Sequence, residues 1–325
     1  MRPFAASPPM IPSLTRFGYI SAACVLLFVL GVMILAPATA TRFALQVERL
    51  MAGLEQHSVE VDGFEMPYLA GGEGPTLLLL HGFTANKDNF SRVAKHLTRD
   101  FHVVIPDLPG FGEASAPQGA DYGLDAQVAR VAGFVEAVSI EEAAHVGGNS
   151  MGGYIAASLA LAHPDKVASL WLLAPAGLAG EQTSEMRREL AETGRNPLLV
   201  QRAENYADVL EMVFHEPPFL PWFVRDTLAG RAAERFDHYT RIFEQIYDAP
   251  ALNERVAEIQ APTLLVWGAE DRVLHPSGAK AWMEQHPDSE LQMLAEIGHL
   301  PMMEAPETVA KALLSFHAER FGGDD

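Results

Sequence analysis

Cysteine is nearly absent from the sequence, because Cys24 is the only one in 325 residues. A single cysteine excludes a disulfide within the chain and a metal site built from several thiolates, and it gives no information about the redox compartment. The twelve histidines include no H-E-x-x-H motif and no pair at metal-ligand spacing with thiolates nearby. We therefore expect neither a metal ion nor another cofactor.

Positive charge is also scarce. The chain has 23 lysine and arginine residues against 42 aspartate and glutamate residues, which gives a formal net charge of -19. A surface this acidic repels a phosphate backbone, so we expect no nucleic-acid partner. The length and a hydrophobic content of 49% are sufficient for one large α/β core with an insertion.

Charged residues are missing altogether from residues 17–36, which follow an N-terminal tail at 1–16. A helix of about twenty residues spans about 30 Å, the thickness of the hydrocarbon core of a bilayer. We expect a membrane protein with a single N-terminal anchor. The alternative is a cleaved signal sequence, because residues 38–40 read Ala-Thr-Ala, and the protein would then be secreted or periplasmic. Arginines flank the span on both sides, so the side of the membrane that the catalytic domain faces stays open.

Residues 37–56 are expected to form a linker or an interfacial helix. Within them, apolar side chains recur at helical spacing from residue 42 onward: Phe43, Val47, Leu50 and Leu54. Such a stripe is typical of a helix that lies on a membrane surface. It is equally typical of a helix that packs against a neighbouring domain.

The motif that organises the rest of the chain is G-x-S-x-G at residues 148–152, between an apolar strand candidate at 144–146 and a predicted helix at 151–162. A strand that turns this sharply into a helix lifts its corner residue, Ser150, out of the sheet and needs glycines around it. The first amides of the following helix, including that of Met151, point toward the same space. The motif predicts a nucleophile beside half of an oxyanion site. An incidental serine in a glycine-rich turn is the alternative.

A serine nucleophile needs a base, an acid that orients the base and a second oxyanion donor. Candidates for all three follow predicted strands. The loop with Phe83 follows the strand at 76–80, Glu270 and Asp271 follow 263–266, and His299 follows 290–294. The carboxyl ends of parallel strands share one edge of a sheet, where such sites lie. Adjacent side chains in an extended loop point in opposite directions, so only one of the two acids can face His299.

The predicted elements alternate as a mostly parallel, doubly wound sheet requires. An antiparallel hairpin at 57–69, with Asp62-Gly63 at its turn, forms the edge of the sheet. We expect a core at 57–177 and 256–325. Between them lies a helical cap at 178–255, where helix-forming stretches at 184–192, 203–214 and 225–247 are separated by prolines. Predicted helices of the core lie at 89–97, 124–138, 151–162, 277–285 and 306–321.

Several motifs in this order resemble the α/β-hydrolase family over nearly all of residues 58–321: His81-Gly82-Phe83, Asp107-Leu108-Pro109-Gly110-Phe111-Gly112, the G-x-S-x-G motif, Gly268-Ala269-Glu270-Asp271 and Gly298-His299. The chain is most similar to the membrane-anchored monoacylglycerol lipases of that family. The resemblance implies an α/β-hydrolase fold and a serine hydrolase of lipid esters. It also implies a triad of Ser150, His299 and Asp271, with backbone amides of Phe83 and Met151 in the oxyanion hole.

Two further residues near the predicted site are interpreted as structural. His81 belongs to the loop scaffold, since the family places its base late in the chain. Asp107 stands at a strand end, where the following turn needs an aspartate to hold backbone amides.

Apolar residues of the cap and of the loop that contains His299 are candidates for binding an acyl chain: Phe214, Phe219, Trp222 and Leu300. One alternative reaction is C–C bond hydrolysis of meta-cleavage products, whose enzymes share this serine motif. Those enzymes commonly carry tryptophan after the catalytic Gly-His, where this chain has Leu300. An alternative of another class is a membrane-tethered small-molecule binding protein without turnover.

Overall fold

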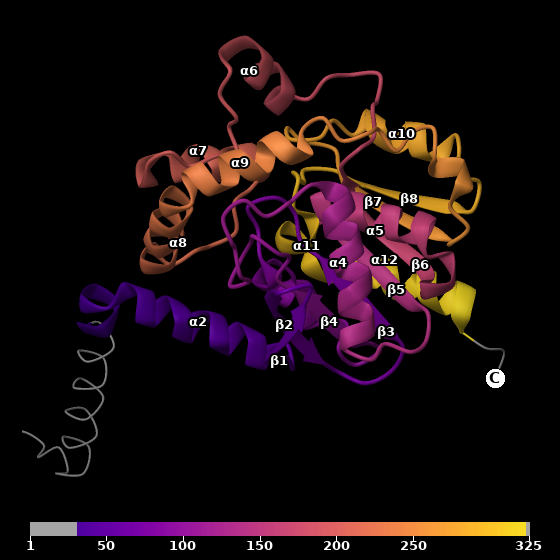
Figure 1. The fold of residues 1–325 in the computed structure, drawn as a ribbon, viewed down its shortest axis with the longest axis horizontal. Helices are drawn as coiled ribbons and strands as arrows, with labels where there is room; N and C mark the ends of the chain where they lie inside the picture. Colours follow the sequence, from indigo (N-terminus) through magenta and orange to yellow (C-terminus); the bar gives the residue numbers. More distant parts are fainter. Residues whose placement is uncertain (1–30, 323–325) are drawn as a thin grey trace, which may run out of the picture.

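The computed structural model describes residues 31–322, and an eight-stranded sheet runs through the centre of the molecule (Figure 1). The strands stand side by side in the order β1-β2-β4-β3-β5-β6-β7-β8. Only the pairs β1–β2 and β2–β4 are antiparallel and the other five pairs are parallel, so the predicted mostly parallel sheet is confirmed. The strands are β1 Glu55–Val61, β2 Phe64–Gly71, β3 Thr76–Leu80, β4 His102–Pro106, β5 Ala144–Ser150, β6 Val167–Pro175, β7 Thr263–Gly268 and β8 Ser289–Leu294.

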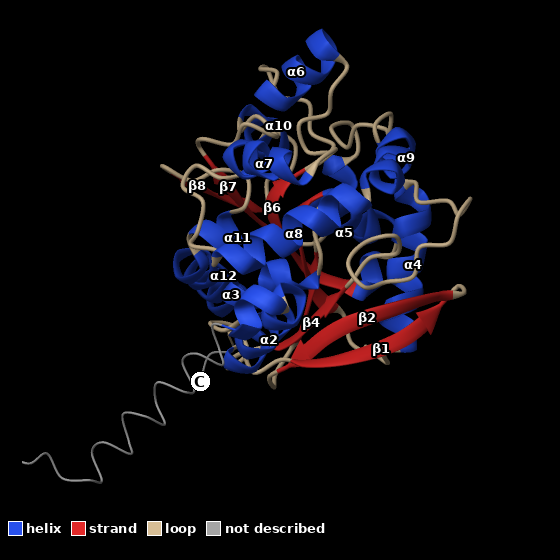
Figure 2. Ribbon diagram, turned by 90° about the vertical axis from the view of Figure 1, so that its left-hand side faces the viewer, coloured by secondary structure: helices blue, strands red, loops and turns tan. Residues whose placement is uncertain are grey.

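Helices cover both faces of this sheet. The α-helices are α2 Pro37–Met51, α3 Ser91–Ala94, α4 Leu124–Ala137, α5 Met151–Ala162, α6 Glu185–Thr193, α7 Tyr206–Val213, α8 Trp222–Glu234, α9 Phe236–Ile246, α10 Ser277–Met283, α11 Pro301–Glu304 and α12 Pro306–Phe321. Short 3₁₀ helices lie at Lys87–Phe90, Pro164–Lys166, Ala203–Asn205 and Val256–Glu258. Figure 2 shows α3, α11 and α12 on one face and α4 and α5 on the other.

The edge hairpin follows directly from its turn sequence. Val61 pairs with Phe64, which leaves Asp62 and Gly63 as a two-residue loop with φ values of 52° and 75°. Two consecutive positive φ angles match the twist of the flanking strands, and Asp-Gly adopts them readily. The hairpin then joins the sheet because β2 pairs antiparallel with β4.

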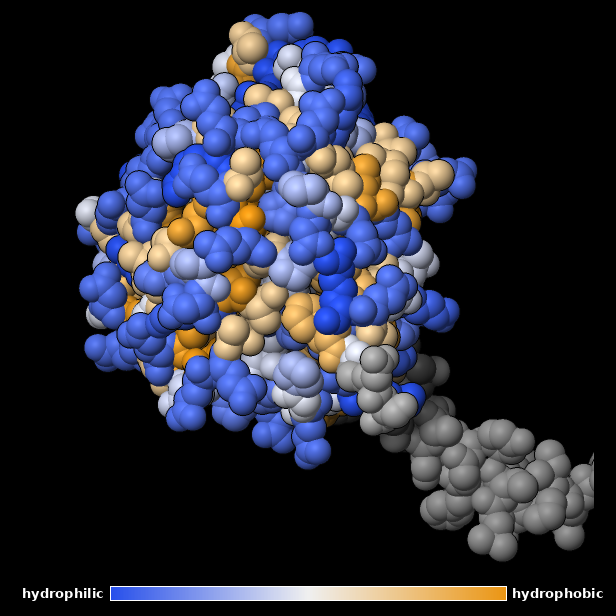
Figure 3. Space-filling model, turned by 90° about the vertical axis from the view of Figure 1, so that its right-hand side faces the viewer, coloured by the Kyte–Doolittle hydropathy of each residue, from blue (hydrophilic) through white to orange (hydrophobic). Residues whose placement is uncertain are grey.

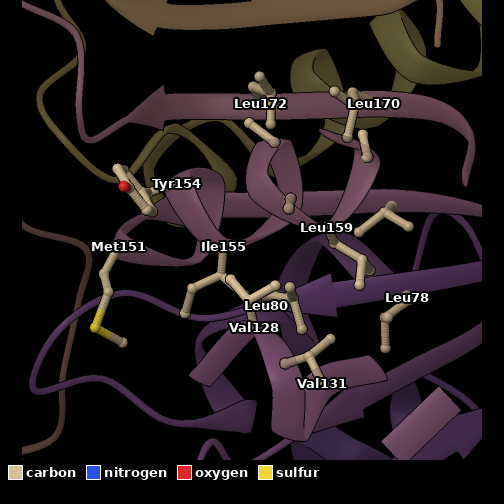
Figure 4. Packing of buried hydrophobic residues seen from close by; sticks show 14 of the residues in the cluster. Leu78, Leu80, Val128, Val131, Met151, Tyr154, Ile155, Leu159, Leu170 and Leu172 are labelled. Carbon is tan, nitrogen blue, oxygen red and sulfur yellow. The ribbon is translucent and has the colours of Figure 1, made fainter. Parts of the chain in front are cut away.

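The core lies in two apolar layers, one on each side of the sheet. In the layer of Figure 4, side chains of α4 and α5 meet those of β3 and β6; the labelled residues include Leu78, Leu80, Val128, Val131, Ile155, Leu159, Leu170 and Leu172. Helix α5 is buried along most of its length, so the segment that follows Ser150 is held rigidly. The side of the molecular surface that Figure 3 shows is predominantly hydrophilic with small hydrophobic patches, in keeping with the acidic composition.

Four α-helices, α6 to α9, lie in the long connection between β6 and β7, the segment that we call the cap (Figure 1). The helix-forming stretch at 225–247 falls on two helices, α8 and α9, which meet at Arg235, whose φ and ψ are -99° and 7°. No glycine or proline marks the break. Tertiary packing accounts for it, because α9 turns to bury Tyr239 and Ile242 in the core.

The first half of helix α2 packs against α8 (Figure 1). The hydroxyl of Thr41 donates to the Phe223 carbonyl oxygen at 3.2 Å. The opposite side of α2 is solvent-exposed, with Phe43 71% and Leu50 62% accessible. Most of the predicted span at 17–36 lies outside the described residues; within 31–322, no helix combines the length and apolar character needed to cross a membrane.

Candidate active site

The G-x-S-x-G motif forms a strained corner between β5 and α5. Ser150 is the last residue of β5 and has φ 56° and ψ -117°, a conformation that residues with side chains rarely adopt. A Cβ added at Gly148 would overlap the backbone of Gly152, and one added at Gly152 would overlap the Leu80 carbonyl oxygen. The corner therefore needs both glycines, and it places the Ser150 hydroxyl at the carboxyl edge of the sheet.

An acid and a base meet at the same edge. His299 Nδ1 lies 2.8 Å from Asp271 Oδ2, and both residues are only 4% exposed. An ionised carboxylate can only accept a hydrogen bond, so Nδ1 carries the proton and Nε2 is left as an acceptor. That tautomer is the one a general base for a serine hydroxyl needs.

Four hydrogen bonds orient the Asp271 carboxylate. Its Oδ2 also accepts from Trp267 Nε1 at 3.0 Å, and its Oδ1 accepts from the amides of Val273 and Leu274, each at 2.9 Å. The neighbouring acid, Glu270, is solvent-exposed instead. Of the two acids considered from the sequence, Asp271 is the one in contact with His299.

Asn149 connects the serine corner to the histidine. Its buried side-chain Nδ2 donates to the carbonyl oxygens of Leu173 and of His299, both at 3.0 Å. The residue before Ser150 thus fixes the backbone of His299 directly. Sequence reasoning missed this role, because Asn149 occupies a position of the motif that tolerates any residue, and the contact spans 150 residues.

The loop after β3 closes the site on the other side of Ser150. Gly82 approaches so closely that an added Cβ would lie 3.3 Å from the Ser150 Cβ. Next to it, the Phe83 amide has no acceptor within the described part of the chain. This amide and the first amide of α5, from Met151, are the two expected oxyanion donors, and their role stays a prediction.

His81 supports that loop as a neutral ring. Burial lowers the pKa of His81, and its two nitrogens take opposite roles. Nε2 accepts from the Leu108 amide at 3.0 Å, while Nδ1 lies 2.9 Å from the Gly82 carbonyl oxygen and donates to it. This geometry agrees with the interpretation of His81 as scaffold.

Asp107 holds the far end of the same loop. Its buried carboxylate accepts from the amides of Lys87 and Glu113, each at 2.8 Å, and from Lys87 Nζ at 2.6 Å. A buried ion pair of this kind is retained only with such additional hydrogen bonds. Asp107 therefore holds the turn that follows β4 against the loop that follows β3. We call this second loop, residues 81–87, the oxyanion loop.

The four residues expected to bind an acyl chain differ from one another in position and in exposure. Phe214 is buried against Gly298, and Leu300 is half-buried against the core layer of α12. Phe219 is 84% exposed and Trp222 50% exposed, so both lie on the outer surface of the cap. Their part in substrate binding stays a prediction.

Two aromatic residues of α9 that the sequence did not single out lie beside the oxyanion loop. The ring of Phe83 lies 6.1 Å from that of Tyr239 and 5.7 Å from that of Phe243. Their four-residue spacing places both on one face of the helix, which was the available signal. They join the cap to the oxyanion loop.

The described residues contain no cluster of three or more histidine, cysteine or carboxylate side chains that could hold a metal ion. The arrangement itself contains a serine, a histidine hydrogen-bonded to a buried carboxylate, and backbone amides. These are the parts of an acyl-transfer site.

Comparison with known proteins gives consistent matches. Residues 75–306 match the family model of the alpha/beta hydrolase fold. Lipase 1 of Psychrobacter immobilis is 37% identical over 286 residues, covering 86% of this chain and 89% of that lipase. Human monoacylglycerol lipase ABHD6 is 29% identical, covering 78% of each chain. The crystal structure of a membrane phospholipase A, a bacterial virulence factor, matches with a TM-score of 0.86 and 40% identity, covering 94% of this chain and 98% of that one.

Proposed function

The chain belongs to the α/β-hydrolase fold family, and we propose that it hydrolyses carboxylic esters of lipids, with monoacylglycerols as the substrate class. Its fold, its serine corner and its lipase relatives make it a serine hydrolase acting on lipid esters. The single observation that carries the assignment is the buried His299–Asp271 pair, which Asn149 ties to the serine corner.

In the proposed mechanism, Ser150 attacks the ester carbonyl while His299 Nε2 takes the hydroxyl proton. Asp271 keeps the imidazole in the reactive tautomer and stabilises its charged form. The amides of Phe83 and Met151 bind the oxyanion, and one such donor is typically worth about 3 kcal/mol of transition-state stabilisation. His299 then protonates the leaving alcohol. Water activated by the same histidine releases the fatty acid and regenerates Ser150.

The lipid substrate class rests on the relatives and on the cap. Two relatives are named as a lipase and a monoacylglycerol lipase, and the matching crystal structure is of a membrane phospholipase A. In this chain, aromatic rings of α9 stand beside the Phe83 ring, and we expect the acyl chain to leave the reacting carbonyl along them. An apolar wall of this kind suits a fatty-acyl ester better than a charged substrate.

Release assays across monoacylglycerols and p-nitrophenyl esters of graded chain length test this function. We expect turnover of monoacylglycerols and a higher kcat/KM for medium or long acyl chains than for acetate, because burial of each additional methylene contributes about 0.8 kcal/mol. A diketone acid of the meta-cleavage-product type serves as the comparison substrate. Faster C–C cleavage of that acid than hydrolysis of any ester would favour the meta-cleavage reaction. Tight binding of a lipid without turnover would favour the alternative that the chain is a small-molecule binding protein.

We also propose that a retained N-terminal anchor holds the enzyme on a membrane through residues 17–36. The folded structure supports retention, because the Ala-Thr-Ala sequence at 38–40 lies within the first turn of α2. Cleavage after Ala40 would remove that turn and the contact that buried Ala40 makes with Phe223 and Val224 of α8. The exposed side chains of Phe43 and Leu50 then extend an apolar surface from the end of the anchor.

Fractionation of cells that express the full chain tests the anchor. We expect the protein to stay with the membranes after an alkaline carbonate wash, because about twenty apolar residues in a helix insert effectively irreversibly. N-terminal sequencing of the same material is the matched measurement. A soluble mature chain that begins at Thr41 would contradict the anchor and favour the signal sequence.

A further inference from the structure

The cap touches the loop that carries His299, which we call the histidine loop, through backbone atoms. We call this contact the cap junction and define it as residues 213–216 on the cap side and Gly298, His299 and Glu304 on the core side. The His299 amide donates to the Val213 carbonyl oxygen at 2.8 Å. A Cβ added at Gly298 would lie 2.7 Å from the His215 nitrogen, so only glycine lets the two loops approach this closely.

Glu304 joins both sides of the cap junction with one carboxylate. Its Oε1 accepts from the Gly298 amide at 2.9 Å. Its Oε2 accepts from the amides of His215 at 2.9 Å and Glu216 at 3.1 Å. Hydrogen bonds from amides to an ionised carboxylate are roughly twice as strong as those between neutral groups. Residues 214–221, which lie between α7 and α8, form no helix or strand of their own.

The carboxylate itself has a firm base. Glu304 ends the short helix α11, whose Met302 is completely buried in the core layer beside α12. Core packing therefore fixes Glu304, and Glu304 in turn fixes the cap loop. Because Val213 accepts from the amide of His299, a displaced cap loop would displace the imidazole as well.

We propose, on the basis of the function proposed above, that Glu304 is a positioning residue: it locks the cap to the histidine loop so that His299 keeps its place between Asp271 and Ser150. The cap and the base then move as one unit. In this arrangement residues 213–216 of the cap supply part of the support of the base.

The test is Glu304→Gln, which keeps the size of the side chain and replaces one acceptor oxygen with an NH₂ group. That group faces an N–H donor, so either Gly298 or the cap amides lose their partner. We expect kcat to fall on the order of 10- to 100-fold with little change in KM, since misplacement of a catalytic group by about 1 Å has this effect. The loss should be equal for p-nitrophenyl acetate and for a long-chain ester, because both need His299.

Glu307→Gln is the matched control, because Glu307 is an exposed acid nearby whose side chain pairs with Lys311 at 2.7 Å. It should leave kcat unchanged. A normal kcat in Glu304→Gln, or a loss confined to KM of the long-chain ester, would overturn the proposal. If Glu304→Gln does not fold, Gly298→Ala separates the same loops sterically and must show the same equal loss of kcat; normal kcat in that variant would also overturn it. A wild-type protein without ester turnover would instead refute the proposed function.

Discussion

Replacement of Ser150 by alanine is expected to lower kcat for ester hydrolysis by on the order of 10⁶-fold, the loss typical when the nucleophile of such a triad is removed. The protein should stay folded, because Ser150 is only half-buried and the substitution removes a single oxygen atom. Alanine must still adopt φ 56°, so the strain at the corner is retained and not relieved. Steady-state release of p-nitrophenol together with thermal unfolding measures both effects.

Ser158→Ala is the matched control for that variant. Ser158 is a half-buried serine on α5, the helix that begins after Ser150, and it lies outside the site. It should retain wild-type kcat and a similar melting temperature. Substantial activity in Ser150→Ala, measured on protein that unfolds cooperatively, would mean that another group attacks the ester.

Asp271→Asn is expected to lower kcat by about 10⁴-fold while leaving the geometry nearly intact. The amides of Val273 and Leu274 keep the side-chain oxygen of the asparagine at the position of Oδ1. Its NH₂ group then replaces Oδ2, where it faces His299 Nδ1 and Trp267 Nε1. A donor at this place forces the imidazole into the tautomer whose Nε2 carries the proton, and that nitrogen cannot accept the serine proton.

The pH dependence of kcat distinguishes loss of this tautomer from general damage to the fold. Glu270→Gln is the control, since it removes a carboxylate from the adjacent, solvent-exposed position. We expect its kcat to be close to that of the wild type over the whole pH range. Comparable losses in both variants, or an Asp271→Asn enzyme with normal kcat, would be incompatible with Asp271 as the acid that orients His299.

The sheet and its hairpin could be predicted because their signals are local. Asp62-Gly63 specifies a tight turn between alternating strands, and the regular sequence of apolar strands and helices specifies a parallel sheet. The predicted strand at 144–146 was too short, since β5 continues to Ser150. Glycine and asparagine disfavour strands. Here the parallel neighbours β3 and β6 pair with the segment from both sides and override that preference.

The expected helix at 89–97 is a second local error with an identifiable cause. The structure has a 3₁₀ turn at Lys87–Phe90 followed by the short α3, because Asn86 forms a capping box with Asn89 and starts the turn early. The sequence shows Asn86 as a candidate helix cap. The apolar pattern at 89–97 favours a longer helix, and the sequence alone does not decide between the two.

Support of the candidate site was less predictable than the position of its expected reacting groups. Ser150 ends β5, while Asp271 and His299 follow β7 and β8, so one rule places all three at the same edge. Asn149 and Glu304 act through contacts between segments 150 and about 90 residues apart, and no spacing in the sequence announces such contacts. The same holds for the rings of α9 beside Phe83, which depend on how the cap folds over the sheet.

Covalent labelling with a fluorophosphonate, followed by intact-mass measurement and peptide mapping, tests whether Ser150 is the nucleophile. We expect one adduct per chain, located on Ser150, absent in Ser150→Ala and formed much more slowly in Asp271→Asn. An adduct on another residue, or no adduct on a folded wild-type protein, would contradict it.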